Sequence, residues 1–212
     1  MPTPPSTRSV KISPDERGGW SSERPRRDGA APRPVDISAR CQVLAPSDRL
    51  RYTPGSLLLI VSADAAEAAR VAERVLEERG AVLSLEKVRG LLAGRVAPEE
   101  IEARAQELLD ATLAKRLGAG QTVVIVVEGL GAEQRESYVR LAHGHRRARH
   151  LILLEIPRGQ VPVQERATLN ELRRALDAGE LGLEGFQTAL RLGGGAIGEL
   201  QRIVFRRPPR EE

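Results

Sequence analysis

The segment best placed to do chemistry follows a short run of branched apolar residues, Leu57–Val61. Such a run is typical of a buried parallel strand, and a helical pattern begins directly after it. A strand that leads at once into a helix is the frame of a phosphate-binding loop, which needs the pattern G-x-x-x-x-G-K-S/T. The glycines let backbone N–H groups surround a phosphate, the lysine reaches the β and γ phosphates, and the hydroxyl holds Mg²⁺.

The residues at these positions do not match that pattern. Ser62 and Glu67 stand where the two glycines belong, Ala68 replaces the lysine, and Ala69 replaces the hydroxyl residue. The carboxylate of Glu67 would also repel a triphosphate. We therefore expect that no cofactor, neither ATP nor Mg²⁺, binds here, and we expect no metal site elsewhere.

The elements that must position this segment alternate between strands and helices. Apolar runs predict strands at 57–61, 81–84, 122–127, 151–156, 187–192 and 203–205. Helical patterns between them predict helices at 65–79, 86–92, 98–117, 132–147, 163–176 and 196–200, with a loop at 193–195. The alternation implies an α/β fold of three layers, in which helices flank a parallel sheet of about five strands. In such sheets ligands bind beyond the carboxyl ends of the strands.

Composition divides the 212 residues into four parts. We expect a disordered arm rich in Pro and Arg, a connector, a domain and a tail, at residues 1–34, 35–56, 57–206 and 207–212. Residues 1–56 hold 10 basic and 6 acidic residues, whereas residues 57–212 hold 23 of each. The net charge of +4 therefore lies entirely in the N-terminal quarter.

The arm carries residues that could bind a partner. Trp20 could act as an anchor, since an aromatic residue is unusual in a passive tail. Four arginines could contact phosphate or an acidic protein surface: Arg24, Arg26, Arg27 and Arg33. We expect a protein partner or a large complex, with nucleic acid as an alternative. A solvated tail without a partner is the other interpretation.

Several classes of protein are excluded or disfavoured. Aromatic residues make up 2% of the chain, which excludes an RNA-recognition fold with several stacking platforms. The single cysteine, Cys41, excludes an intramolecular disulfide and a cysteine-cluster zinc site. No apolar run approaches the roughly 18 residues that span a bilayer, and the N-terminus lacks an apolar leader. We expect a cytoplasmic protein with no membrane partner.

Three histidines lie close together in the sequence, among arginines. His143 and His145 do not share a helix face, and the arginines around them oppose a bound cation. We expect a solvated basic helix end at 143–150, with a phosphate-binding or partner-binding patch as the alternative.

The order and spacing of several segments carry a family resemblance. These segments are Thr53–Val61, Ser84–Leu91, Ala114–Gly120 with the strand after it, Ala132–Arg135 with Leu141-Ala142, and Leu172–Leu176 with Glu184–Phe186. From Tyr52 to about Phe205 the chain resembles the kinase domain of bacterial polynucleotide kinases, part of the P-loop kinase superfamily. Members of that family phosphorylate the 5′-hydroxyl of a nucleic acid with ATP and Mg²⁺.

The resemblance implies roles for three further residues. The family aspartate that activates the 5′-hydroxyl falls on Glu86, and the arginine three residues later is retained as Arg89. A strand-end aspartate of the family falls on Val126, and Glu128 on the same strand face is a possible substitute ligand for Mg²⁺. The family lid is largely deleted, and Arg158 and Arg166 are the lid-like cations that remain.

The number of lost groups decides the functional interpretation. Phosphoryl transfer depends almost wholly on positioning and electrostatic stabilisation, and one lost contact often costs about 10²–10³ in rate. The sequence therefore predicts a pseudokinase: a non-catalytic, P-loop kinase-like interaction or scaffold subunit tethered by its arm. One alternative is an atypical ATP-dependent polynucleotide kinase that acts through Glu86, Arg89 and Glu128. The other is a nucleic-acid-binding module.

Overall fold

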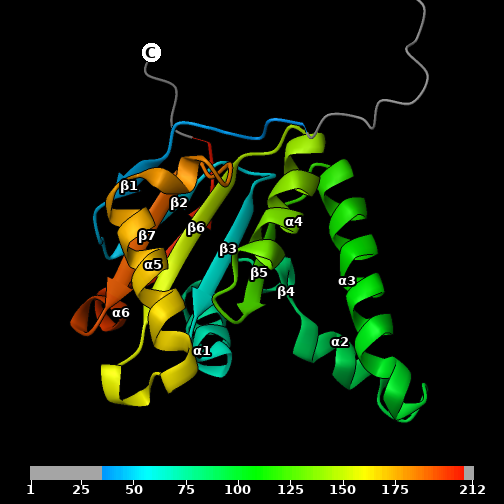
Figure 1. Ribbon diagram of the computed structural model, residues 1–212. Coiled ribbons are helices and arrows are strands. Elements are labelled where there is room, and N and C mark those ends of the chain that lie inside the picture. Colours follow the sequence, from blue (N-terminus) through cyan, green and yellow to red (C-terminus); the bar gives the residue numbers. More distant parts are fainter. Residues whose placement is uncertain (1–34, 208–212) are drawn as a thin grey trace, which may run out of the picture. The chain divides into compact units, whose positions relative to one another are not determined.

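In a computed structural model the chain divides into residues 1–35 and 36–212, and the structure describes residues 35–207. Within the described residues a six-stranded sheet has the order β1-β7-β6-β3-β5-β4, and every neighbouring pair is parallel (Figure 1). Its strands are β1 (Gln42–Leu44), β3 (Leu57–Ser62), β4 (Val82–Ser84), β5 (Val123–Glu128), β6 (Arg149–Glu155) and β7 (Thr188–Gly193). The expected α/β fold with a parallel sheet is confirmed.

Two apolar cores, one on each face of the sheet, give the domain its three layers. Successive side chains of a strand point to opposite faces, so Leu59 of β3 enters one core while Leu58 and Ile60 enter the other. Helices α3, α4 and α5 cover the first core, and α1, α6 and a small second sheet cover the other. The helices are α1 (Ala65–Val75), α2 (Leu85–Leu92), α3 (Ile101–Gly118), α4 (Ala132–Gly144), α5 (Arg166–Asp177) and α6 (Gly195–Glu199).

Short polar side chains at the strand ends start two of the helices. The Asp64 carboxylate accepts a hydrogen bond from the Glu67 N–H and begins α1, and the Ser84 hydroxyl accepts one from the Lys87 N–H and begins α2. Short 3₁₀ turns complete the connections: η2 (Arg79–Ala81), η3 (Pro98–Glu100), η4 (Arg158–Gln160), η5 (Val163–Glu165) and η6 (Glu180–Gly182). No helix in the described part of the chain has the length and apolar character needed to cross a membrane.

The segment expected to be a connector supplies two strands instead. β1 pairs with β7 at one edge of the main sheet, and β2 (Arg49–Tyr52) pairs with β8 (Arg202–Phe205) in a parallel two-stranded sheet. Gly182 lets the segment approach closely, because a Cβ there would lie 2.2 Å from the Ala39 carbonyl oxygen. The segment from Asp36 onward is therefore part of the domain rather than a separate linker.

Three further local expectations need correction. The main sheet has six strands among the described residues rather than about five. Helix α1 ends at Val75, four residues before the expected end, because Leu76 leaves the helix to bridge Ile203 of β8. The expected glycine loop is short, since β7 extends through Gly193 and α6 begins at Gly195.

Candidate functional site

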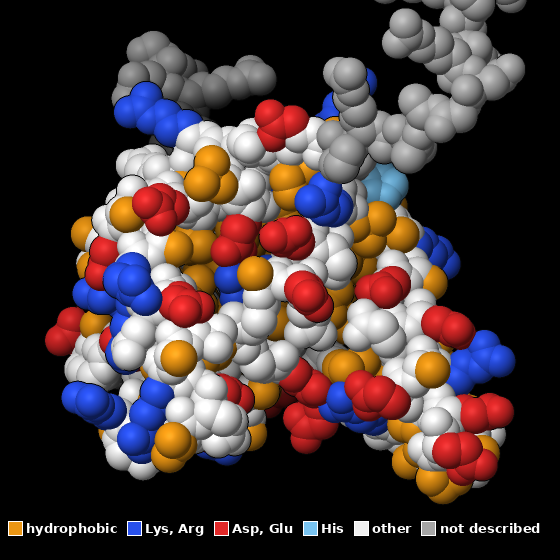
Figure 2. All heavy atoms as spheres, in the orientation of Figure 1, with side chains coloured by type: hydrophobic (Ala, Val, Ile, Leu, Met, Phe, Trp, Pro, Cys, Tyr) orange, Lys and Arg blue, Asp and Glu red, His pale blue; other side chains and the backbone are white. Residues whose placement is uncertain are grey.

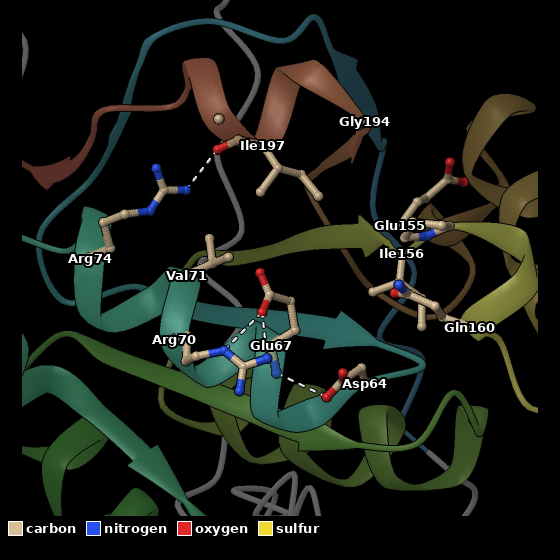
Figure 3. Close-up of a pocket in the computed structure, with 12 residues that line it drawn as sticks. Asp64, Glu67, Arg70, Val71, Arg74, Glu155, Ile156, Gln160, Gly194 and Ile197 are labelled. Carbon is tan, nitrogen blue, oxygen red and sulfur yellow. Dashed lines mark hydrogen bonds and ion pairs between the residues drawn. The ribbon is translucent and has the colours of Figure 1, made fainter.

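A crevice opens at the carboxyl ends of β3, β6 and β7, the edge at which parallel sheets bind ligands. Its volume is about 700 Å³. Figure 3 shows α1 on one side, the segment after β6 on another, and the start of α6 across from α1. The lining residues are Asp64, Glu67, Arg70, Val71, Arg74, Glu155, Ile156, Pro157, Gln160, Gly194, Ile197 and Gly198.

The turn that enters α1 is too short to surround a phosphate. β3 ends at Ser62 and α1 begins at Ala65, so two residues separate the strand from the helix. The Ser62 hydroxyl accepts a hydrogen bond of 3.2 Å from the Asp64 N–H. The Asp64 carboxylate accepts one of 2.9 Å from the Glu67 N–H (Figure 3). A carboxylate of the chain itself thus occupies the positive end of the helix, where phosphates bind in other proteins.

The positions of the missing lysine and hydroxyl lie in the first turns of α1. Ala68 is fully buried in the core beneath the helix, and Ala69 packs against the same core. Glu67 turns outward and forms an ion pair of 2.6 Å with Arg70. Neither alanine can supply a cation or a metal ligand. Arg70, which follows Ala69 in the sequence, is already paired with the Glu67 carboxylate.

Of the three residues carried over by resemblance, the structure brings two together. Arg89 donates two hydrogen bonds to Glu128, of 2.7 and 2.9 Å, and two more to Glu102, of 2.7 and 2.8 Å. The hydrogen bonds to Glu102 and Glu128 raise the pKa of Arg89, and Arg89 lowers the pKa of Glu102. Glu86 is exposed and lies in a separate shallow groove between α1 and α2, which Arg70 and Lys87 also line.

This arrangement does not fit Mg²⁺. Both carboxylate oxygens of Glu128 accept hydrogen bonds from Arg89, so the proposed substitute ligand faces a cation of the protein. Mg²⁺ needs carboxylates and phosphates that are free to enter its octahedral shell. Within residues 35–207, no group of three or more His, Cys, Asp or Glu side chains could hold a metal ion.

The crevice also contains residues that sequence reasoning missed. Glu155, at the end of β6, accepts a hydrogen bond of 2.5 Å from Arg173 of α5. Arg74 of α1 donates one of 2.8 Å to the Ile197 carbonyl and so ties α1 to α6 (Figure 3). The sequence did contain a signal for Glu155: it follows an apolar run and stands two residues before Pro157, where a strand meets the ligand-binding edge.

The histidine cluster differs from the solvated helix end expected for it. Arg149 and His150 belong to β6 and are buried, at 6% and 7% exposure. The Nδ1 of His143 lies 2.6 Å from the Nη1 of Arg149. The Nδ1 of His150 lies 2.9 Å from the Thr188 hydroxyl. Burial, with a smaller effect of Arg149, lowers the pKa of His150 to about 4, so this ring is neutral near pH 7.

The expected partner residues in the arm, Trp20, Arg24, Arg26, Arg27 and Arg33, lie outside the described residues. On the face drawn in Figure 2, acidic and basic side chains are interspersed rather than gathered by sign. A broad basic stripe, which is typical of nucleic-acid-binding domains, is not visible on this face.

Comparison with known proteins finds similarity to solved structures, and that similarity is distant. No family model and no curated protein matches the chain. The crystal structure of a proposed kinase from Chloroflexus aurantiacus aligns with a TM-score of 0.39 and 15% identity, and covers 69% of this chain and 88% of that one. A similarity of this degree carries no argument about activity, and the resemblance to polynucleotide kinases stays a prediction.

Proposed function

We propose that this chain is a non-catalytic domain built on a parallel sheet of the P-loop kinase type, which serves as an interaction subunit of a larger assembly. The observation that carries the proposal is the start of α1. There the Asp64 carboxylate, bonded to the Glu67 N–H at 2.9 Å, takes the place that a triphosphate would need.

Three features of the surrounding site support the same interpretation. The crevice is lined by three carboxylates and two arginines, and one of these arginines, Arg70, is paired with Glu67, so the wall offers little positive charge to a polyphosphate. The position of the phosphate-binding lysine is a fully buried alanine, Ala68. The retained Arg89 is bonded on both sides by Glu102 and Glu128, so its charge is neutralised within the protein.

The direct test is calorimetry of ATP with Mg²⁺, followed by an assay for transfer of the γ-phosphate to an oligonucleotide 5′-hydroxyl. We expect no binding heat and no transfer from the folded protein. Transfer that is abolished by Glu86→Ala would refute the proposal and establish the kinase alternative. Glu99→Ala is a matched control, because it removes an exposed glutamate that lies at a helix start but outside the crevice and the groove.

A further inference from the structure

A second, smaller pocket lies beside the crevice, between the segment after β6 and the first two turns of α5. Three of its six lining residues are arginines, and none is acidic; the residues are Arg158, Val161, Arg166, Leu169, Asn170 and Arg173. The four residues from α5 fall at spacings of three, four and seven, which places them on one stripe of the helix. Segment and helix thus place three arginines around one small space.

The three arginines are only partly satisfied by the protein. Arg173 donates through Nε to Glu155 at 2.5 Å and through Nη1 to Asn170 at 3.2 Å. Arg166 donates through Nε to the Val161 carbonyl at 3.2 Å, and the guanidinium of Arg158 has no hydrogen-bond partner among the described residues. A guanidinium has five N–H donors, so most of the donors around this pocket have no protein partner and are free to bind a ligand in place of water.

The charge balance favours an anion. Glu155 offsets one of the three positive charges through its ion pair with Arg173, and the remaining two have no carboxylate in the pocket wall. The two arginines without a carboxylate partner make the pocket wall positive, which favours a bound anion. Arginine forks match a carboxylate with two parallel hydrogen bonds.

The size of the pocket indicates which anion. Its volume is about 30 Å³, which is room for roughly two water-sized groups, such as the two oxygens of a carboxylate. A nucleotide would not fit in a space of this volume. Leu169 and Val161 provide an apolar wall against which the methylene groups of a glutamate can pack.

We propose that this pocket binds a glutamate or aspartate side chain of an acidic segment in a partner protein. The inference rests on the proposed function as an interaction domain and adds the chemistry of the partner. Arginine is also among the residues most enriched at the centres of protein interfaces.

The test is fluorescence anisotropy of the full chain with a labelled octaglutamate peptide at low ionic strength, with octaglutamine as the neutral reference. We expect octaglutamate to bind, and Arg158→Ala and Arg166→Ala each to weaken binding roughly tenfold, since each removes charge-assisted hydrogen bonds. Arg166→Lys keeps the charge but not the fork, so an intermediate loss is expected. Arg49→Ala is the matched control, because it removes an exposed guanidinium that has no hydrogen-bond partner among residues 35–207.

Three outcomes would overturn the inference: no octaglutamate binding, an equal loss in Arg49→Ala, or octaglutamine binding as tightly as octaglutamate. Binding of inorganic phosphate that Arg166→Ala abolishes, without octaglutamate binding, would assign the pocket to phosphate instead and would also overturn it. Binding of ATP with Mg²⁺, measured separately, would refute the proposed function and not this pocket, so the two failures are distinguishable.

Discussion

Replacement of Arg135 should be among the most damaging single changes in the domain. Its side chain is 4% exposed and lies between α4 and the segment after η6. It donates two hydrogen bonds to Glu184, of 3.0 and 2.8 Å, and two more to the carbonyls of Leu130 and Gly131. One guanidinium therefore joins the turn before α4 to a segment about 50 residues later in the sequence.

The magnitude follows from what Arg135→Ala leaves behind. Glu184 is 19% exposed, so its carboxylate would stay largely buried without a counter-charge, beside carbonyl oxygens that have lost a donor. Removal of one partner from a buried ion pair costs about 3–5 kcal/mol of the free energy of unfolding. For a domain of this size that corresponds to a decrease in Tm of about 6–20 °C.

Urea unfolding followed by far-UV circular dichroism measures this loss. Tryptophan fluorescence is not a suitable probe of the domain, because the single tryptophan, Trp20, lies outside the unit from Asp36 to Glu212. Arg104→Ala is the control: its ion pair with Glu107 is exposed on both sides, and its loss should change stability by less than about 1 kcal/mol. A loss below about 1 kcal/mol in Arg135→Ala, or one equal to the control, would refute the reasoning.

Four further predictions follow from single contacts. Asp64→Ser keeps the helix cap and should leave stability nearly unchanged, whereas Asp64→Ala should cost about 1 kcal/mol in urea unfolding; equal losses would contradict the capping role. Ala68→Lys should lower Tm strongly without conferring ATP binding, because the side chain at this position is fully buried, whereas Ala69→Lys should be tolerated better; tolerated lysine at position 68 would argue against the buried geometry. Gly182→Ala should destabilise the domain by about 1–3 kcal/mol, since its Cβ would overlap a carbonyl 2.2 Å away; an unchanged Tm would contradict this close approach. His150 has a folded pKa of about 4, below its unfolded value, so its contribution to the free energy of unfolding is present above pH 6.5 and is lost as pH falls toward 4. Between pH 7 and pH 5 the wild type should therefore lose about 2 kcal/mol more of its free energy of unfolding than His150→Gln does. Parallel profiles of stability against pH for the two proteins would contradict this.

The central strands could be predicted from the sequence because a strand that is buried on both faces consists of consecutive apolar residues. Leu57–Val61 and Val123–Val127 are unbroken apolar runs, and both are found in adjacent parallel strands. β1 has no such apolar run. Gln42–Leu44 is three residues long and largely exposed, and its pairing with β7 depends on residues far away in the sequence. The local sequence pattern cannot predict a strand whose formation depends only on pairing with a strand that is distant in the sequence.

The candidate site divides in the same way. The absence of a lysine at Ala68 could be read from its position after a strand, because a phosphate-binding loop is a local motif. The bond between Arg89 and Glu128 joins residues 39 positions apart, and Glu155 bonds to Arg173 across 18 positions. Such pairs form because the sheet brings its strand ends beside the flanking helices, and spacing in the sequence does not encode this arrangement.

The parallel pairing of β1 with β7 and of β2 with β8 has a consequence for folding during synthesis on the ribosome. These strands find partners about 150 residues later in the chain, which at ordinary rates of synthesis emerge roughly 10–30 s afterwards. Until then the segment from 42 to 52 has nothing to pair with, and its apolar residues Leu50 and Tyr52, buried in the finished domain, stay accessible to water and to other nascent chains. Closure of the domain is therefore a late event, and a chain that stalls before β8 would leave β2 without its partner strand.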